Sequence, residues 1–242
     1  MKPKAKKRLK ITLLSVVTVL VLLCAGFYIY TLDYYRADDN AVAVLSSTEA
    51  GPQIEQKDDM WIFHPSAEQD KGVGFIFYPG GKVEDKAYSV LLQQLAQQGI
   101  TGVLVHMPFN LAVFDISAAD KIYAQFPEIK QWVMGGHSLG GAMASSYAVK
   151  NQDRIEGLVL LGAYPVKDSD IPTLAIYGSE DKVLNKSKLS ASLNPYVIEG
   201  GNHAQFGNYG AQKGDGEATI TREEQQRVAV EEITKFIVDT TK

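Results

Sequence analysis

Short apolar runs recur along most of the chain, separated by polar or amphipathic stretches. The clearest run, GVGFIFY at residues 72–78, is followed at once by the turn sequence Pro79-Gly80-Gly81. Apolar runs of about four to eight residues between turn signals are typical of buried strands. We expect strands, the first of them weak, at residues 41–45, 61–63, 72–78, 102–106, 131–134, 158–161, 173–177 and 196–198.

The stretches between these runs have the period of amphipathic helices. Between residues 85 and 98, apolar side chains recur at i, i+3, i+4 and i+7, and Gly99 fits the C-terminal cap. Further helices are expected at residues 117–125, 138–150, 186–193 and 221–238. The last of these opens with Thr221 and Glu224 in the T-x-x-E pattern of a capping box.

This alternation of strands and helices predicts an α/β fold, a mostly parallel sheet with helices on both faces. Ligands of such sheets bind beyond the carboxyl ends of the strands. Residues 31–58 are predicted to form a polar stalk with the first weak strand, and residues 59–242 a single domain. No gap between the predicted elements is long enough for a second domain.

The first thirty residues follow a different pattern. Residues 1–10 carry six basic side chains and no acidic one, and residues 11–30 carry no charge. Twenty helical residues span about 30 Å, the thickness of the hydrocarbon core of a bilayer. We therefore expect a basic cytoplasmic segment at residues 1–10, a transmembrane signal-anchor at residues 11–30, and a domain outside the cytoplasm at the cell membrane. A cleaved signal peptide, which would give a secreted domain, and a buried core helix are the alternatives.

Charge and cysteine content narrow the classes of partner. The formal net charge is −4, and removing the six basic residues of the first ten leaves −10 for the rest. Such an acidic domain argues against nucleic-acid binding. The only cysteine, Cys24, lies in the apolar run, and bulky Leu23 before it argues against a lipoprotein. The predicted external domain therefore has no disulfide and no cysteine-based metal site.

One motif carries candidate chemistry. Gly136-His137-Ser138-Leu139-Gly140 matches G-x-S-x-G between a predicted strand and a predicted helix. A sharp turn in this context exposes the serine hydroxyl, and the flanking glycines let strand and helix approach. The Leu139 amide then points to the site of a developing oxyanion at the helix N-terminus. A plain glycine-rich turn fits the pentapeptide alone, but its position between strand and helix favours Ser138 as a nucleophile.

A serine nucleophile needs a general base, and the base needs an orienting acid. The chain has four histidines, and His203 follows the last predicted strand in the sequence GGNHAQFG, which makes it the expected base. The expected acid is Asp181, just after the strand at residues 173–177, with Glu180 as the alternative. The chain order Ser138, Asp181, His203 is the order given for this strand–turn–helix architecture.

Other residues near predicted strand ends are expected close to the substrate. The Gly81 amide is the expected second oxyanion donor, with Lys82 next, although a plain β-turn also fits this sequence. Weaker candidates for substrate contact are Lys82, His106, Phe109, Asn110 and His137. Of these, His137 adjoins Ser138, so its side chain should point away from the turn. We expect no metal site.

From about residue 72 to the C-terminus, the chain resembles a small member of the α/β-hydrolase superfamily, in the branch called α/β-hydrolase family 5. The segments that carry the resemblance are FYPGGKVEDKAYSVL, MPFNLAVF, GGHSLGGAMA, YGSEDKV and GGNHAQFGNYG. The resemblance implies an α/β-hydrolase fold and a Ser–His–Asp hydrolase without a metal or an organic cofactor. It leaves the substrate open. Pro79 stands where many relatives have histidine, a departure in the oxyanion loop.

These features together predict a membrane-anchored, extracytoplasmic serine hydrolase that cleaves an ester or related acyl bond of a small-molecule substrate. An acyltransferase that uses the same triad is one alternative. A non-catalytic cell-surface binding module on a hydrolase fold is the other. Because residues 162–172 are too few for a lid domain, the substrate cleft is expected to be open.

Overall fold

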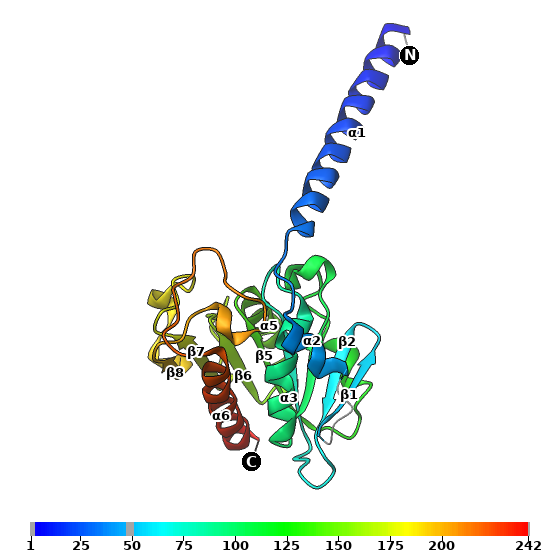
Figure 1. Cartoon of the computed structure of the whole chain (residues 1–242). Helices are drawn as coiled ribbons and strands as arrows, with labels where there is room; N and C mark the ends of the chain where they lie inside the picture. Colours follow the sequence, from blue (N-terminus) through cyan, green and yellow to red (C-terminus); the bar gives the residue numbers. More distant parts are fainter. Residues whose placement is uncertain (1–2, 47–50, 242) are drawn as a thin grey trace. The chain divides into compact units, whose positions relative to one another are not determined.

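The computed structural model of the protein describes residues 3–46 and 51–241. The chain divides into two units, Met1–Tyr34 and Tyr35–Lys242. The first unit contains the long helix α1, Pro3–Leu32 (Figure 1). Within it, Lys7–Leu32 has a mean hydropathy of 2.4 in its most apolar window. By length and composition this segment fits a membrane span, and it fits a signal sequence equally well.

The second unit is built on one sheet. Among the described residues its strand order is β1-β2-β4-β3-β5-β6-β7-β8. The strands are β1 Gln53–Lys57, β2 Met60–His64, β3 Val73–Tyr78, β4 Thr101–Val105, β5 Gln131–His137, β6 Gly157–Leu161, β7 Thr173–Gly178 and β8 Pro195–Ile198. From β4 to β8 all neighbours are parallel, whereas β1 and β2 pair antiparallel at one edge. The mostly parallel sheet confirms the predicted fold class.

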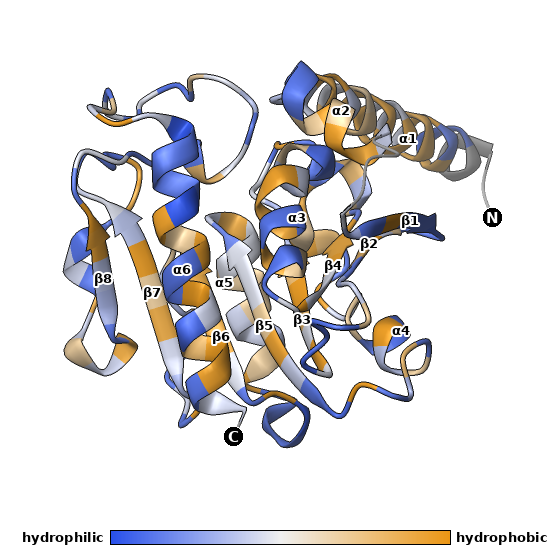
Figure 2. Cartoon of the chain, turned by 60° about the horizontal axis from the view of Figure 1, so that its bottom comes forward, coloured by the Kyte–Doolittle hydropathy of each residue, from blue (hydrophilic) through white to orange (hydrophobic). Residues whose placement is uncertain are grey.

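Helices cover both faces of this sheet. Along β3, Phe75 and Phe77 pack into one hydrophobic cluster while Ile76 and Tyr78 pack into another, because successive side chains of a strand point to opposite faces. The first cluster includes side chains of α3, Ser89–Gln97, and α6, Arg222–Thr240, which cross the near face of the sheet in Figure 2. The second includes side chains of α4, Asp120–Tyr123, and α5, Leu139–Ala148.

Two predictions for the start of the domain are wrong. The expected strand at residues 41–45 is part of a helix, α2, Asp39–Ser46. Asp38 caps it, since its carboxylate accepts a hydrogen bond from the Ala41 amide at 3.0 Å, and such a cap favours a helix at this position. The expected stalk is also shorter, because the Tyr35 amide already donates to the Lys82 carbonyl within the compact unit.

Other predicted helices are shorter or divided. Residues 85–98 begin with a 3-10 turn before α3, the helix expected at residues 117–125 shrinks to α4, and residues 186–193 form two 3-10 turns. The 3-10 turns are η1 Asp85–Tyr88, η2 Pro108–Asn110, η3 Ala112–Phe114, η4 Gln152–Arg154, η5 Lys186–Lys188, η6 Ala191–Leu193 and η7 Ala204–Phe206. The capping box at Thr221 is half formed: its hydroxyl accepts from the Glu224 amide, but the Glu224 carboxylate binds Arg227.

Candidate active site

Ser138 lies in a strained turn between β5 and α5. Its backbone has φ 52° and ψ −121°, a left-handed value of φ that non-glycine residues rarely adopt. The turn is also crowded. A Cβ at Gly140 would lie 2.2 Å from the carbonyl oxygens of both Tyr78 and Pro79, and one at Gly136 would lie 2.6 Å from Gly140. The glycines of the motif therefore permit the close strand–helix contact that the sequence predicts.

The His203 and Asp181 side chains form a buried pair. His203 Nδ1 lies 2.8 Å from Asp181 Oδ2, and the two residues are 1% and 2% exposed. The other carboxylate oxygen, Oδ1, accepts hydrogen bonds from the Val183 and Leu184 amides, each at 2.8 Å. A carboxylate only accepts hydrogen bonds, so Nδ1 of His203 carries the proton and Nε2 is left as a base.

The structure places Asp181, rather than the alternative Glu180, beside His203. The Glu180 carboxylate instead accepts a hydrogen bond from the Ser179 hydroxyl. His203 Nε2 is buried and has no hydrogen-bond partner among the described residues, so Ser138 is not bonded to it in this state. Hydrogen bonds of catalytic groups are often long in free enzymes and tighten when substrate binds.

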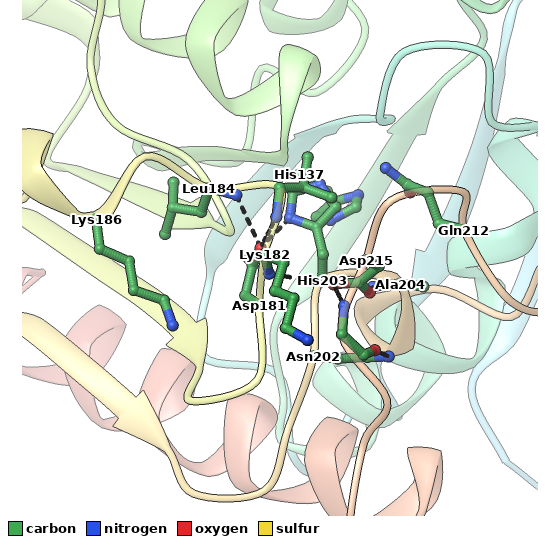
Figure 3. A network of polar contacts seen from close by, with 12 residues as sticks. His137, Asp181, Lys182, Leu184, Lys186, Asn202, His203, Ala204, Gln212 and Asp215 are labelled. Carbon is green, nitrogen blue, oxygen red and sulfur yellow. Dashed lines mark hydrogen bonds and ion pairs between the residues drawn. The ribbon is translucent and has the colours of Figure 1, made fainter.

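Residues outside the predicted motifs hold this pair in place (Figure 3). The Asp215 carboxylate accepts a hydrogen bond from the Ala204 amide at 2.9 Å, directly after His203. On α6, the Gln225 side chain accepts from the Asn202 amide and donates to the Asn202 carbonyl. Gly162 has φ 53°, and a Cβ there would lie 2.8 Å from His203 Nδ1. The base therefore sits in a fixed, crowded position.

His137, which precedes Ser138, is completely buried. Its Nδ1 lies 2.8 Å from the Tyr88 hydroxyl, which also accepts a hydrogen bond from the Gly80 amide at 3.0 Å. The His137 and His203 rings are 4.5 Å apart between centroids. Burial holds the pKa of His137 well below its usual value, and the neighbouring His203 lowers this pKa further. His137 is therefore neutral near pH 7.

A cleft of about 640 Å³ contains both Ser138 and His203. Its walls come mainly from two loops, one after β6 and one after β7. The residues that line it are Ser138, Leu139, Ala142, Gly162, Ala163, Tyr164, Pro165, Val166, Asp168, Val183, Leu184, Asn185, Lys188, Ser190, Leu193 and His203. Four carboxyl-end loops, those after β5, β6, β7 and β8, thus bring the candidate nucleophile, the candidate base and an apolar wall to one cleft.

None of the five weaker candidates for substrate contact lines this cleft. His106 lies in a separate cavity, and its Nδ1 is 3.4 Å from the Asp85 carboxylate. The hydrogen bond with Asp85 raises the pKa of His106. His137 is buried and lies outside the cleft lining. Lys82 and Asn110 meet each other instead, since the Lys82 amide donates to the Asn110 carbonyl at 2.8 Å. Phe109 packs edge-on against Phe114.

Comparison with known sequences places the chain in a family. The family described as "Alpha/beta hydrolase family" matches residues 74–227, more than half of the chain. The chain belongs to the alpha/beta hydrolase family. The match confirms the resemblance and includes the segments that hold Ser138, Asp181 and His203. A search of curated proteins gave no match.

Solved structures share this alpha/beta hydrolase fold at low sequence identity. TT1662 from Thermus thermophilus is 14% identical with a TM-score of 0.55, and the match covers 77% of this chain and 98% of that one. Est1E from Butyrivibrio proteoclasticus is 14% identical with a TM-score of 0.53, covering 79% of this chain and 99% of that one. Est1E has also been solved with ferulic acid bound. At this level of identity the likeness supports the fold alone.

Sequence reasoning missed several parts of the site. Gly162 carries one local signal, a glycine at a strand end, which indicates a close approach or a positive φ. Tyr88, Asp215 and Gln225 carry none, because they reach the site only through tertiary contacts. No group of three or more potential metal ligands lies together in the part of the chain that the structure describes.

Proposed function

We propose that this protein is a membrane-anchored, extracytoplasmic serine hydrolase that cleaves an ester or related acyl bond through an acyl-enzyme. Ser138 is the nucleophile, His203 the general base and Asp181 the orienting acid. The observation that carries the proposal is the buried His203–Asp181 pair, at 2.8 Å, whose histidine lines the same cleft as the strained Ser138. The family match supports the same reaction class.

The reaction follows from the geometry in two halves. Ser138 Oγ attacks the acyl carbon while His203 Nε2 takes the hydroxyl proton, and Asp181 stabilises the resulting imidazolium. His203 then gives this proton to the leaving oxygen, the bond from the acyl carbon to that oxygen breaks, and the acyl group remains on Ser138. Water attacks the acyl carbon while His203 takes one of its protons. Return of that proton to Ser138 Oγ releases the carboxylic acid.

Two backbone amides are proposed to stabilise the oxyanion. Leu139 is the first residue of α5, where the helix dipole favours negative charge. Gly81 approaches it closely, because a Cβ at Gly81 would lie 2.8 Å from Leu139 Cδ2. The preceding amide, Gly80, is already used by the Tyr88 hydroxyl. These contacts favour Gly81 over its neighbours as the second donor.

The location is proposed from α1 and its flanking charge. An uncleaved anchor would keep the chain in the membrane with the hydrolase domain outside the cytoplasm. Mass spectrometry of the mature protein tests this directly. Retention of residues 1–30 supports the anchor, and their loss would replace it with a secreted enzyme without changing the proposed chemistry.

Ser138→Ala in the full-length chain tests the reaction. The substrates are p-nitrophenyl esters of increasing chain length and, because Est1E binds ferulic acid, a ferulate ester. We expect the turnover of the best ester to fall at least about 1,000-fold, and labelling by a fluorophosphonate probe to disappear. Ser146→Ala, on the same helix α5, is the matched control. We expect it to retain both the ester turnover and the labelling by the fluorophosphonate probe. Folded wild-type protein that neither turns over esters nor reacts with the probe would contradict the proposal and favour a binding module.

A further inference from the structure

One buried hydroxyl contacts two segments of the candidate active site. Tyr88, at the end of η1, is 0% exposed, and its hydroxyl accepts a hydrogen bond from the Gly80 amide at 3.0 Å. The same oxygen lies 2.8 Å from His137 Nδ1. Gly80 adjoins the proposed oxyanion donor Gly81, and His137 adjoins the proposed nucleophile Ser138. Tyr88 and His137 are far apart in the sequence, 49 positions from each other.

The hydrogen bonds favour one direction for the contact between Tyr88 and His137. A tyrosine hydroxyl has one proton to donate, and Tyr88 already accepts the proton of the Gly80 amide. Burial raises the pKa of Tyr88, so the hydroxyl stays protonated. Its proton therefore points at His137 Nδ1, the one imidazole nitrogen within reach. Neutral His137 then carries its own proton on Nε2, which is buried without a hydrogen-bond partner among the described residues.

His137 in turn packs against the proposed base. The two imidazole rings are 4.5 Å apart between centroids, and His137 Nδ1 is held by the Tyr88 hydroxyl. A rotation of the His137 ring would disturb both contacts. The site has little room for such movement, because a Cβ at Gly80 would lie 2.7 Å from the Tyr88 hydroxyl and 2.8 Å from His137 Nδ1.

We propose that Tyr88 is a positioning residue for catalysis, acting through His137 and Gly80. Its hydroxyl fixes the ring that supports His203, and it holds the Gly80 peptide so that the Gly81 amide faces the oxyanion. This inference rests on the proposed serine-hydrolase function and adds to it a residue that contacts neither the substrate nor the reacting atoms. Groups positioned in this way affect the transition state more than the binding of substrate.

The chain offers a matched control in Tyr78. This second buried tyrosine also binds two backbone groups, accepting from the Ala119 amide and donating to the Ile116 carbonyl, both at 2.9 Å. Its side chain packs on the other face of the sheet from Tyr88. Loss of its hydroxyl removes a comparable pair of hydrogen bonds without a contact to His137.

Tyr88→Phe and Tyr78→Phe are compared in the full-length chain with the best p-nitrophenyl ester. We expect kcat of Tyr88→Phe to fall at least about tenfold with KM changed less than about twofold. For Tyr78→Phe we expect kcat within about twofold of wild type. Equal kcat values for the two variants, or a loss in Tyr88→Phe that is entirely in KM, would overturn the proposal. A wild-type enzyme without esterase activity or probe labelling would instead overturn the proposed function.

Substitutions of His137 test whether Tyr88 acts through His137. They give an answer even if Tyr88→Phe does not fold. In His137→Asn the side-chain oxygen can take the place of Nδ1 as an acceptor for Tyr88, whereas in His137→Leu it cannot. We expect His137→Asn to retain more kcat than His137→Leu, by about fivefold or more. In the double variant Tyr88→Phe/His137→Leu, the loss of kcat should be smaller than the product of the two single losses, because the two residues share one contact. Losses that multiply, or equal kcat in His137→Asn and His137→Leu, would show that Tyr88 does not act through His137.

Discussion

The two sides of the candidate active site differ in exposure and in bonding. The buried side consists of Tyr88, His137, Asp181 and His203, each at most 2% exposed. The open side is the cleft wall formed by Tyr164, Val166, Val183 and their neighbours in the two loops, and these three side chains are 36%, 51% and 41% exposed. Hydrogen bonds fix the buried side, whereas exposed apolar side chains form much of the open side.

This difference separates two tasks within one cleft. Groups that move protons must keep their tautomer and position, and burial together with a hydrogen bond such as that from His203 Nδ1 to Asp181 supplies both. A wall that contacts an acyl or leaving group needs only shape and apolar surface. Changes on the buried side should therefore alter kcat and stability, and changes on the open side should alter KM. The predictions below test that division.

Asp181→Asn should give the largest effect. The asparagine oxygen can still accept from the Val183 and Leu184 amides, but its NH₂ group would then face His203 Nδ1. That arrangement moves the imidazole proton to Nε2, which can no longer accept the Ser138 proton. We expect kcat to fall about 1,000- to 10,000-fold, as for the same change in an unrelated serine protease, with KM little changed in steady-state assays.

Glu180→Gln is the matched control for this change. It alters the neighbouring acid in the same turn, whose carboxylate binds the Ser179 hydroxyl. We expect its kcat to stay within about threefold of wild type. A large loss in Glu180→Gln together with a small one in Asp181→Asn would reverse the assignment of the acid. It would also contradict the buried side as the source of catalysis.

The pH dependence of stability tests the buried side by a second route. Burial lowers the pKa of His137 well below 6.5 in the folded chain, whereas in the unfolded chain this imidazole titrates near 6.5. As pH falls below 6.5, the unfolded state therefore binds a proton that the folded state does not. The free energy of unfolding should decrease by up to about 1.4 kcal/mol per pH unit from this group. In His137→Asn, chemical denaturation between pH 7 and 5 should show a flatter profile.

His106→Gln provides the control with the opposite sign. The Asp85 carboxylate raises the pKa of His106, so this pair stabilises the fold below the unfolded pKa, and that contribution is lost as pH rises through the folded pKa. Because His106 is exposed, its contribution should be small. His106→Gln should keep the wild-type loss of stability on acidification. An unchanged slope in His137→Asn would contradict the neutral, buried state of His137.

Features set by neighbouring residues could be predicted from the sequence, whereas contacts between distant residues could not. Buried strands such as residues 73–78 were predictable because an apolar run between turn signals has few other solutions. The turn at Ser138 was predictable because its glycines are adjacent in the chain. From the sequence, Tyr88 is only an apolar position in the predicted helix at residues 85–98, since nothing local shows that its hydroxyl contacts a residue 49 positions away. Hydrogen bonds between distant positions of this kind are visible only in the folded structure.

The open side was harder still to predict. Phe109 and Asn110, in the apolar segment at residues 107–114, are expected from the sequence to contact substrate, but the cleft is lined instead by the loops after β6 and β7. Residues 107–114 follow β4, and the two cleft loops follow β6 and β7. These strands are parallel in one sheet, so all three segments start at the same edge of the sheet. Which loop folds over Ser138 depends on its packing and hydrogen bonds, as where the Val166 amide donates to the Ser145 hydroxyl.

Val166→Ala should give the smallest effect and defines the open side most directly. The Val166 side chain lines the cleft and is 51% exposed, so its loss leaves no core cavity and should change the free energy of unfolding by less than about 0.5 kcal/mol. Two carbons fewer in the wall remove up to about 1 kcal/mol of apolar contact from a bound ester. We expect KM for the longer p-nitrophenyl esters to rise about two- to fivefold, with kcat unchanged and no effect on the acetate ester. A fall in kcat equal for all esters would place Val166 with the buried side, and the division between the two sides would then fail.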